Sequence, residues 1–277
     1  MSDDARPTLQ GRTIVMSGGS RGIGLAILLA AARQGANAVI LAKTDQPDER
    51  LPGTVHTAVA EIEQAGGRAV AVVGDVREEA DVERAVATAV ESFGGVDIVI
   101  NNASALNLTG TAEVTPKRYD LMQSINSRGT YLLTRACLPH LQKSSDAQIL
   151  TLSPPINLDP AWLGRFPPYM LSKYGMTLLT LGFAAEFAGS VRANCLWPQT
   201  TIATAAVVNL LGGEEAASKA RSPEIMADAA VALLTDPALP TGRVLIDEDA
   251  LAESGVTDLS GYGGGDDPEL DFFVEKR

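Results

Sequence analysis

Residues 14–24 read Ile-Val-Met-Ser-Gly-Gly-Ser-Arg-Gly-Ile-Gly, and this stretch decides the fold. The apolar run predicts a buried strand, the glycines a tight turn, and the Leu/Ala-rich residues 25–32 a helix. Glycines 18, 22 and 24 lack the Cβ atoms that would hold a large anion off the backbone, and the first N–H groups of the helix point toward it. A merely structural turn is the alternative, but the strand–turn–helix context favours a site for a nucleotide pyrophosphate.

The composition is compatible with one α/β domain that has a large core. The chain has 277 residues, of which 45% are hydrophobic. Its net charge of −12 argues against binding to nucleic acid or to an anionic membrane surface. The two cysteines, Cys137 and Cys195, argue against a disulfide framework or a cysteine-rich zinc site, and we predict no metal. Because we recognise neither a signal peptide nor a bilayer-spanning segment, we expect a cytoplasmic protein.

Short apolar runs alternate with helical patterns along the chain. Further strands are predicted at 37–42, 69–74, 96–101, 148–153, before Pro198 and at 244–246, and helices at 54–65, 81–93, 115–138, from 167 and at 223–234. This alternation implies right-handed βαβ crossovers and a doubly wound, Rossmann-type parallel sheet. We predict a single α/β domain over residues 1–252 and an acidic, glycine-rich C-terminal tail over residues 253–277.

Two basic residues lie where the second predicted strand meets the glycine turn. Lys43 follows that strand, and Arg21 lies on the turn. A carboxylate at this point of a dinucleotide fold holds the ribose 2′-hydroxyl, whereas a basic residue accommodates a 2′-phosphate. We therefore predict NADP as the cofactor. NAD is the alternative, because Asp45 and Asp48 lie nearby and either cation could be an ordinary surface charge.

Asp75 follows the third predicted strand, at the edge where ligands collect in open parallel sheets. Its carboxylate could accept a hydrogen bond from an adenine amino group. It could equally cap the helix that begins near Glu78.

The strongest chemical pattern follows the strand 148–153. Pro167-Pro168 can open a helix that carries Tyr169 and Lys173 four positions apart on one face. Because a nearby cation stabilises a phenolate, we expect Lys173 to lower the pKa of Tyr169 toward working pH and make the phenol an acid or base. Ser153 could hydrogen-bond the substrate oxygen, or simply end its strand. The signal lies in the coexistence of these residues with the glycine turn.

Asn126 interrupts the apolar face of the helical region 115–138. An asparagine in a helix is more often a local hydrogen-bonding residue than a catalyst. The neighbouring Gly129 indicates that another backbone or a ligand approaches closely here.

Taken together, these motifs resemble the short-chain dehydrogenase/reductase family. The resemblance runs from about residue 9 to residue 247 and rests on Ser17-Gly18-x-x-x-Gly22-x-Gly24, Asp75, Asn101-Asn102-Ala103, Asn126, Ser153, Tyr169-x-x-x-Lys173 and Pro198. Segments 149–160 and 195–200 are most similar to one subgroup, whose animal members carry an additional sterol-carrier domain.

The resemblance implies hydride transfer between nicotinamide C4 and a carbonyl or alcohol carbon. It assigns Tyr169 as general acid/base, Ser153 to the substrate oxygen, Lys173 to the ribose and the phenol, and Asn126 to a water relay. The cofactor-binding residues that we predict are Ser17, Gly18, Ser20, Arg21, Gly22, Ile23, Gly24, Lys43, Asp75, Val76, Asn102, Ala103, Lys173, Pro198 and Thr201.

Some positions depart from the family pattern. Ser104 and Gln199 replace glycines that are usual in the family, and Ile202-x-Thr204 is displaced by one residue. The segment between Ser153 and Tyr169 is also longer than usual. These departures affect the shape of the substrate pocket and the nicotinamide contacts, and they leave the acid/base set intact.

The residues beyond the predicted strand at 191–197 suggest a lid and an apolar pocket. We expect a helical stretch over 203–211 to form the lid. Trp162, Leu163, Phe166 and Trp197 could line the pocket, or belong to the core or an interface. The tail is flexible by default, but the apolar residues 270 and 272–274 suggest docking, which we expect on a neighbouring subunit because the family usually forms oligomers across its fifth and sixth helices.

The leading hypothesis is an NADP(H)-dependent oxidoreductase that acts on an apolar aldehyde, ketone or alcohol as a homo-oligomer. An enoyl thioester reductase on the same scaffold is one alternative. A cofactor-binding sensor or interaction protein without turnover is the other.

Overall fold

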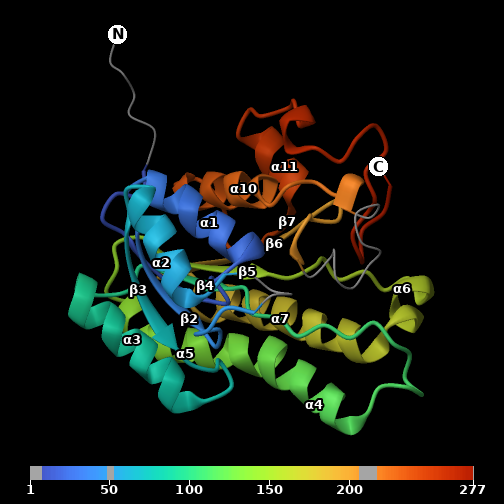
Figure 1. Ribbon diagram of the computed structural model, residues 1–277, viewed down its shortest axis with the longest axis horizontal. Helices are drawn as coiled ribbons and strands as arrows, with labels where there is room; N and C mark the ends of the chain where they lie inside the picture. The colour runs from blue at the N-terminus through green and yellow to red at the C-terminus, as the bar shows by residue number, and fades with distance from the viewer. Residues whose placement is uncertain (1–7, 49–52, 206–216, 277) are drawn as a thin grey trace.

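The computed structural model describes residues 8–48, 53–205 and 217–276 and centres on one seven-stranded sheet (Figure 1). All neighbouring strands are parallel, in the order β3-β2-β1-β4-β5-β6-β7. The strands are β1 (Thr13–Ser17), β2 (Asn37–Ala42), β3 (Arg68–Val73), β4 (Ile98–Asn101), β5 (Ala147–Leu152), β6 (Val191–Trp197) and β7 (Val244–Ile246). The predicted doubly wound, Rossmann-type sheet is confirmed.

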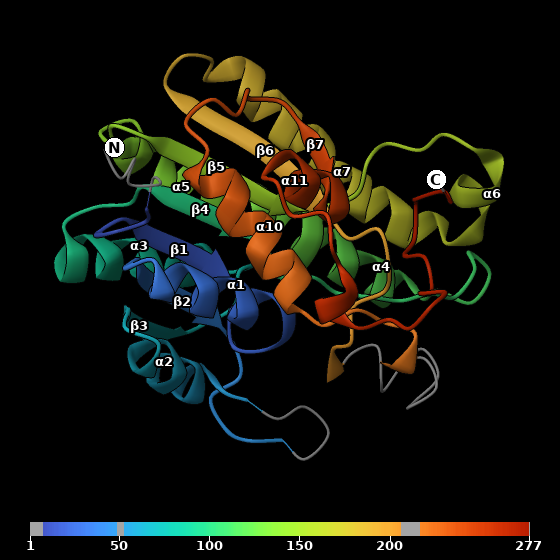
Figure 2. The same cartoon turned by 90° about the horizontal axis from the view of Figure 1, so that it is seen from above.

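Helices cover both faces of the sheet, as the two views in Figures 1 and 2 show. One face carries α1 (Gly22–Arg33), α2 (Val55–Gln64), α10 (Glu224–Thr235) and α11 (Asp247–Glu253). The other carries α3 (Glu79–Phe93), α4 (Pro116–Gln123), α5 (Gly129–Leu141) and α7 (Pro167–Glu186). Shorter elements are the π-helical turn η1 (Ser124–Arg128), α6 (Pro160–Arg165) and the 3₁₀ turn η2 (Ser260–Tyr262).

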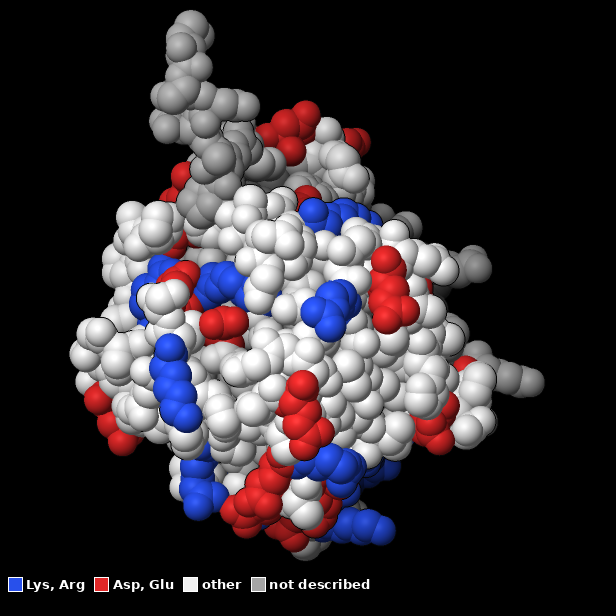
Figure 3. Space-filling model, turned by 90° about the vertical axis from the view of Figure 1, so that its left-hand side faces the viewer, with Lys and Arg blue, Asp and Glu red and all other residues white. Residues whose placement is uncertain are grey.

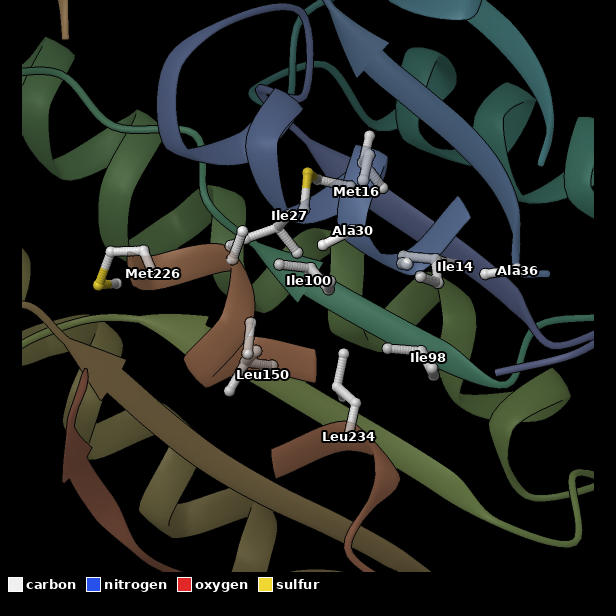
Figure 4. Close-up of a cluster of buried hydrophobic side chains, with 14 of the residues drawn as sticks. Ile14, Met16, Ile27, Ala30, Ala36, Ile98, Ile100, Leu150, Met226 and Leu234 are labelled. Carbon is white, nitrogen blue, oxygen red and sulfur yellow. The ribbon is translucent and has the colours of Figure 1, made fainter. Parts of the chain in front are cut away.

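The core is split between these two faces because successive strand residues point to opposite sides of a sheet. Ile14 and Met16 of β1 pack toward α1 and α10, whereas Val15 packs toward α3 and α5. Figure 4 shows the first cluster, in which Ile27 from α1 and Leu234 from α10 lie beside the strand side chains. This burial on both faces explains why the strands read as continuous apolar runs.

The helical region 115–138 is interrupted, because α4 and α5 are separated by the π-helical turn η1. Thr115 caps α4 by accepting a hydrogen bond from the backbone N–H of Arg118, and Pro116 occupies the first turn. A π-helical turn inside a helix widens the backbone locally and often marks a functional site. Here it lies opposite α7 and positions Asn126.

The sheet order places a topological switch beside β1. The chain builds β2 and β3 on one side of β1 and then crosses to β4 on the other side. Connections on the two sides of β1 therefore run to opposite faces and leave a crevice at the carboxyl ends of the strands. This crevice is where the site lies.

Two further observations concern the surface. No helix among the described residues is long and apolar enough to cross a membrane. On the face at the β3 side of the molecule, acidic and basic side chains are interspersed, with no large patch of one sign (Figure 3).

Candidate active site

A cavity of about 890 Å³ lies at the switch point, over the carboxyl ends of β1, β2 and β4. Most of the predicted cofactor residues line it, namely Gly18, Ser20, Arg21, Gly22, Ile23, Gly24, Lys43, Asp75, Val76, Asn102 and Ala103. Four do not: Ser17, Lys173, Pro198 and Thr201. The cavity also reaches residues that sequence reasoning missed, among them Thr44, Gly53, Glu61, Ser104, Ile125 and Thr204.

The glycine turn fits a pyrophosphate. Gly18 and Gly22 have φ values of +75° and +55°, a region that favours glycine. A Cβ on Gly18 would stand 2.9 Å from Asn102 Nδ2 and 3.0 Å from the backbone of Ala103. Helix α1 starts without a side-chain cap, so its first N–H groups face the cavity free to bind an anion.

Ser17 and Asn102 hold the turn in place. The Oγ of Ser17 accepts hydrogen bonds from the N–H groups of Asn102 (3.3 Å) and Ala103 (3.2 Å). The Nδ2 of Asn102 in turn donates to the carbonyl oxygens of Ser17 and Gly18, at 3.2 and 2.9 Å. Ser17 does not line the cavity itself. Its hydroxyl instead fixes the backbone of Asn102 and Ala103, which do line it.

Beside the glycine turn, Lys43, Arg21 and Asp75 line the cavity near the carboxyl ends of β2 and β3. Lys43 Nζ lies 3.4 Å from Asp75 Oδ2, and Arg21 donates a hydrogen bond to Thr44 Oγ1. Asp75 also accepts hydrogen bonds from the backbone and guanidinium of Arg77. Burial by itself would raise the pKa of Asp75. The contacts with Arg77 and Lys43 stabilise the carboxylate more strongly and lower its pKa to about 2. The alternative role of Asp75 as a helix cap is wrong, because α3 begins after Glu78 without a side-chain cap.

The two acidic residues that favoured NAD lie away from the cavity. Asp45 Oδ1 lies 2.6 Å from Nε2 of His56, which takes up its carboxylate. Neither Asp45 nor Asp48 lines the cavity. Among the described residues, the carboxylates that do line it are those of Asp75 and Glu61.

Lys173 is held at the end of β5. It is 2% exposed, its Nζ donates a 2.6 Å hydrogen bond to the carbonyl of Leu152, and the ammonium stands 4.8 Å from the centre of the Trp197 ring. Burial lowers the pKa of Lys173 to about 7, against the opposing charge of Asp271. Lys173 therefore lies beside Ser153, the residue that follows Leu152.

Tyr169 lies one helical turn before Lys173 on α7 and is 5% exposed. Burial, with a smaller contribution from Asp271, raises the pKa of its phenol well above the usual value. The expectation that Lys173 lowers this pKa is thus wrong for the structure as it stands. The physical reason is that burial removes water from around the phenolate, which raises its free energy. Lys173 is itself buried and does not offset this cost.

Ser153 has the clearest open hydrogen-bonding capacity. Its Oγ is fully buried and makes no hydrogen bond to a nitrogen or oxygen atom of the described residues; its interaction with the thiol of Cys195 is a weak one, since sulfur is a poor hydrogen-bonding partner. Thr201 Oγ1 is buried and without a partner among the described residues. Buried polar atoms are normally paired, so these two hydroxyls are suited to a ligand. The cavity, the glycine cradle and these unpaired groups together fit a dinucleotide and a small oxygen-bearing substrate.

The hydrogen bonds of Asn126 hold two neighbouring segments, the loop at Ala105 and helix α7 at Ser172. Its Oδ1 accepts from the Ala105 N–H (2.7 Å), and its Nδ2 donates to the Ala105 carbonyl (3.1 Å) and to Ser172 Oγ (2.8 Å). A close approach at Gly129 is present, but the prediction of a backbone or a ligand there is wrong: the neighbour is the side chain of Val76, whose Cγ1 would stand 2.9 Å from a Cβ on Gly129. The water relay assigned to Asn126 stays a prediction.

The C-terminal tail docks on its own chain. Trp197 Nε1 donates to the Phe272 carbonyl at 2.9 Å, and Gln199 Nε2 donates to the Glu275 carbonyl at 2.9 Å. The expected docking of this tail on a neighbouring subunit is therefore wrong for the described residues. Three consecutive glycines with positive φ, at 263–265, turn the chain back, and apolar side chains 272–274 then reach the aromatic residues near Tyr169.

The large apolar residues that could line a substrate pocket instead form a small third core. Trp162, Leu163, Phe166 and Trp197 pack with Tyr169 and Phe273. Most of the predicted lid, residues 206–211, lies outside the described residues.

A doubly wound sheet with an open glycine turn at its switch point, and a Tyr–Lys pair beside a strand end, is the arrangement of a dinucleotide-binding dehydrogenase fold. The chain belongs to the short-chain dehydrogenase/reductase family, since the family model described as short chain dehydrogenase matches residues 12–212.

The chain is also similar to named relatives. It is 53% identical to hydroxysteroid dehydrogenase-like protein 2 of Danio rerio over 92% of this chain and 61% of that protein. The protein of the same name from Homo sapiens is 47% identical over 97% of this chain and 64% of that protein. The chain thus spans under two thirds of the length of these relatives, and the subgroup resemblance of residues 149–160 and 195–200 is confirmed.

Solved structures of similar length agree closely. A structure from Xanthomonas campestris has a TM-score of 0.93 and 50% identity, over 97% of this chain and 100% of that chain. A short chain dehydrogenase from Mycobacterium thermoresistibile has a TM-score of 0.92 and 52% identity, over 97% and 96% of the two chains.

Proposed function

We propose that this protein transfers a hydride between NADP(H) and an apolar aldehyde or ketone, or the corresponding alcohol, with Tyr169 as general acid/base. The observation that carries the proposal is the burial of Tyr169 and Lys173 on one turn of α7, beside the unpaired Oγ of Ser153. Few other functions require a phenol, an amine and an unpaired hydroxyl at the edge of a dinucleotide site.

A bound nicotinamide supplies or accepts the hydride at C4. In the direction of reduction, the phenol of Tyr169 gives its proton to the carbonyl oxygen as the carbonyl carbon takes up the hydride and its electron pair. Ser153 Oγ donates a hydrogen bond to the same oxygen, where negative charge develops. Protonated Lys173 then stabilises the phenolate until it regains a proton, and oxidation of the alcohol runs through the same groups in reverse.

The preference for NADP is supported by the charges at the β2 end of the cavity. Lys43 has a side chain that is 59% exposed, so its ammonium can turn toward a 2′-phosphate. Arg21 lies on the adjacent glycine turn and lines the same cavity. No carboxylate directly follows β2, where one would otherwise hold the 2′-hydroxyl of NAD.

An apolar substrate is supported by the residues around Tyr169. Met122, Trp162, Trp197 and Ile246 share the apolar cluster that contains the phenol. A substrate whose oxygen reaches Tyr169 must place its carbon skeleton against these side chains. Burial of such a skeleton is favourable at roughly 25 cal/mol per Å² of apolar surface.

We further propose that the protein is a cytoplasmic homo-oligomer. The large apolar side chains of Tyr131, Leu171 and Leu178 are 44%, 49% and 60% exposed on α5 and α7. Association through these helices would cover them. Sedimentation of the full chain as a monomer only would contradict the oligomer.

The direct test of the function is a substrate panel followed by the absorbance of the reduced nicotinamide. The panel contains medium-length aldehydes, terpenoid ketones, a steroid ketone suggested by the names of the relatives, and an enoyl thioester. We expect oxidation of NADPH by carbonyls, with a lower kcat/KM for NADH. Oxidation by the enoyl thioester alone would show a C=C reductase instead.

One observation favours the non-catalytic alternative, a cofactor-binding sensor: Tyr169 is covered by Phe273 in the structure. Tight NADPH binding without turnover across the whole panel would establish that alternative.

A further inference from the structure

Residues 269–275, here called the C-terminal strap, pair with the loop 199–201 like a short antiparallel strand. Thr200 and Leu270 form an antiparallel bridge. The N–H of Thr201 donates to the Glu269 carbonyl at 2.8 Å, and the N–H of Asp271 donates to the Gln199 carbonyl at 3.1 Å. Together with the side-chain hydrogen bonds from Trp197 and Gln199, this pairing holds the strap across the end of α7 that carries Tyr169.

Phe273 is the part of the strap that enters the active site. Its ring is 1% exposed and its centroid lies 6.2 Å from the ring of Tyr169, 5.3 Å from Tyr174, 5.6 Å from Trp162 and 6.4 Å from Trp197. Its φ of +69° is the only positive value of a non-glycine residue in the described ranges. Such backbone strain persists only where the surroundings impose it, and it is concentrated at functional sites.

Phe273 and Tyr169 share one buried apolar cluster that neither hollow of the site reaches at Tyr169. The cofactor cavity ends at residues such as Ser104 and Thr204, and Tyr169 does not line it. A second hollow of about 580 Å³ lies beyond the strap, lined on one side by Phe273, Gln199 and Ile246. A substrate oxygen must come within about 3 Å of the phenol to take its proton. Because Tyr169 is 5% exposed and lines neither hollow, a side chain packed around it has to move, and Phe273 is the one that the strap carries.

We propose that the strap is a built-in competitor of the substrate, in which Phe273 occupies the place of the substrate's apolar group and lifts off the loop 199–201 when substrate binds. This inference rests on the proposed function and deepens it. Aromatic rings surround Phe273 on several sides. A substrate that takes the place of this ring would therefore carry a flat or ring-sized apolar group beside its carbonyl.

The charges around the strap are consistent with a closure that can be reversed. Asp271 packs near Asp247 and Glu269, which repel its charge, and near Lys173, which attracts it. Burial and these two acidic neighbours raise the pKa of Asp271 to about 7. Asp271 is only partly buried and accepts a hydrogen bond from the Phe272 N–H, so the repulsion from Asp247 and Glu269 weakens the closed position without forbidding it.

A reversible lock tests the proposal. The hydrogen bonds flanking Thr200 and Leu270 make them a non-hydrogen-bonded antiparallel pair, whose Cα atoms typically lie about 4.5 Å apart, within the range that a disulfide spans. We would prepare the Thr200→Cys/Leu270→Cys double variant of the full chain. The native Cys137 and Cys195 are buried and cannot readily compete for pairing.

We expect the oxidised double variant to lose at least about tenfold in turnover of an aromatic ketone, and dithiothreitol to restore it. NADPH affinity, followed by the fluorescence of the reduced nicotinamide, should be equal in both redox states. Equal turnover in the oxidised and reduced forms would overturn the proposal, because substrate would then reach Tyr169 under a closed strap.

Phe273→Ala gives an independent measurement. Removing the ring should lower KM for the aromatic ketone about tenfold with little change in kcat, because the substrate no longer competes with it. Phe93→Ala, at the far end of α3 where Arg68 stacks on the ring, is the matched control and should leave KM unchanged. An unchanged KM in Phe273→Ala would contradict the proposal that Phe273 competes with the substrate.

Tryptophan emission reports strap position without turnover, because both tryptophans of the chain, Trp162 and Trp197, contact Phe273. If neither redox form of the double variant oxidises NADPH with any carbonyl, the proposed function fails. Quenching of the tryptophan emission by acrylamide then still tests whether the strap opens. A ketone-dependent rise in quenching in the reduced form alone supports the proposal. Equal quenching in both forms overturns it.

Discussion

Asn126 Nδ2 lies 2.8 Å from Ser172 Oγ, and this hydrogen bond ties the π-helical turn η1 to α7 between its two reactive side chains. Ser172 Oγ also donates to the Tyr169 carbonyl at 2.7 Å. Ser127 Oγ adds a second tie by donating to the Ser172 carbonyl at 2.9 Å. The position of Tyr169 and Lys173 therefore depends on how closely η1 and α7 approach.

That approach requires a glycine at residue 175. A Cβ there would overlap the Oγ of Ser127 and stand 3.1 Å from its Cβ. We expect Gly175→Ala to destabilise the fold by about 1–3 kcal/mol, because the Oγ of Ser127 must turn away from the Ser172 carbonyl that it bonds and its Cβ must give way. Chemical denaturation monitored by circular dichroism measures this change.

Gly182 on the same helix is the matched control, because a Cβ there meets nothing within 4 Å. Gly182→Ala should stabilise the protein by about 0.5–1 kcal/mol through helix propensity alone. Ser127→Gly should recover most of the loss in Gly175→Ala. Equal effects of the two alanine substitutions would show that the close approach is unimportant.

Tyr169→Phe should abolish the proton transfer while keeping the ring that packs against Phe273. We expect kcat to fall about 10²–10⁴-fold, with NADPH affinity within a factor of about two. Tyr119→Phe, on the exposed face of α4, serves as the control and should retain full turnover. Turnover in Tyr169→Phe at the level of the unmodified protein would remove Tyr169 from the mechanism.

Lys43→Ala should weaken NADPH binding more than NADH binding, because only the former carries a 2′-phosphate. We expect the dissociation constant for NADPH to rise about tenfold or more, as measured by fluorescence titration. Lys143→Ala, an exposed lysine beyond α5 that does not line the cavity, should change neither constant. Equal weakening of both cofactors would contradict a 2′-phosphate contact.

Asp247 should make stability depend on pH. It is fully buried, accepts hydrogen bonds from the N–H groups of Gln199 and Glu248, and faces the charges of Glu248, Arg221 and Asp271. Burial raises its pKa from 3.8 to about 7. A pKa raised in the folded state gives a stability that is complete below pH 3.8 and is lost as pH rises to about 7, by up to about 1.4 kcal/mol per pH unit.

Asp247→Asn keeps an acceptor for both backbone groups and removes the charge. It should therefore raise the free energy of unfolding at pH 8 and flatten the dependence between pH 4 and about 7. Asp120→Asn, on the exposed surface of α4, should leave the pH profile of unfolding as it is. A steeper profile in Asp247→Asn would show that the carboxylate stabilises the fold.

Much of the architecture was predictable because it depends on local pattern. The strands at 37–42 and 244–246 have the predicted bounds, since buried parallel strands are short apolar runs between glycines and polar turns. The glycine turn and Lys43 reach the predicted cavity, because residues at the carboxyl ends of neighbouring parallel strands share one edge.

The errors arose where partners are distant in sequence. Asp75 pairs with Lys43 and Arg77 rather than capping a helix. The pKa of Tyr169 is raised rather than lowered, because a strap about a hundred residues further along the chain excludes water from it. A helical spacing of four predicts that two side chains share a face, but it carries no information on what covers that face.

By itself, the sequence determined the class of fold, the place of the glycine turn, and the spacing of Tyr169 and Lys173, the proposed reactive groups, on one helix. These follow from periodicity and backbone freedom within short segments. Only the tertiary structure decided that Phe273 closes over Tyr169 and that Gln199 helps to hold the strap there. Burial and its effect on charge depend on the packing of the whole chain, which no local pattern encodes.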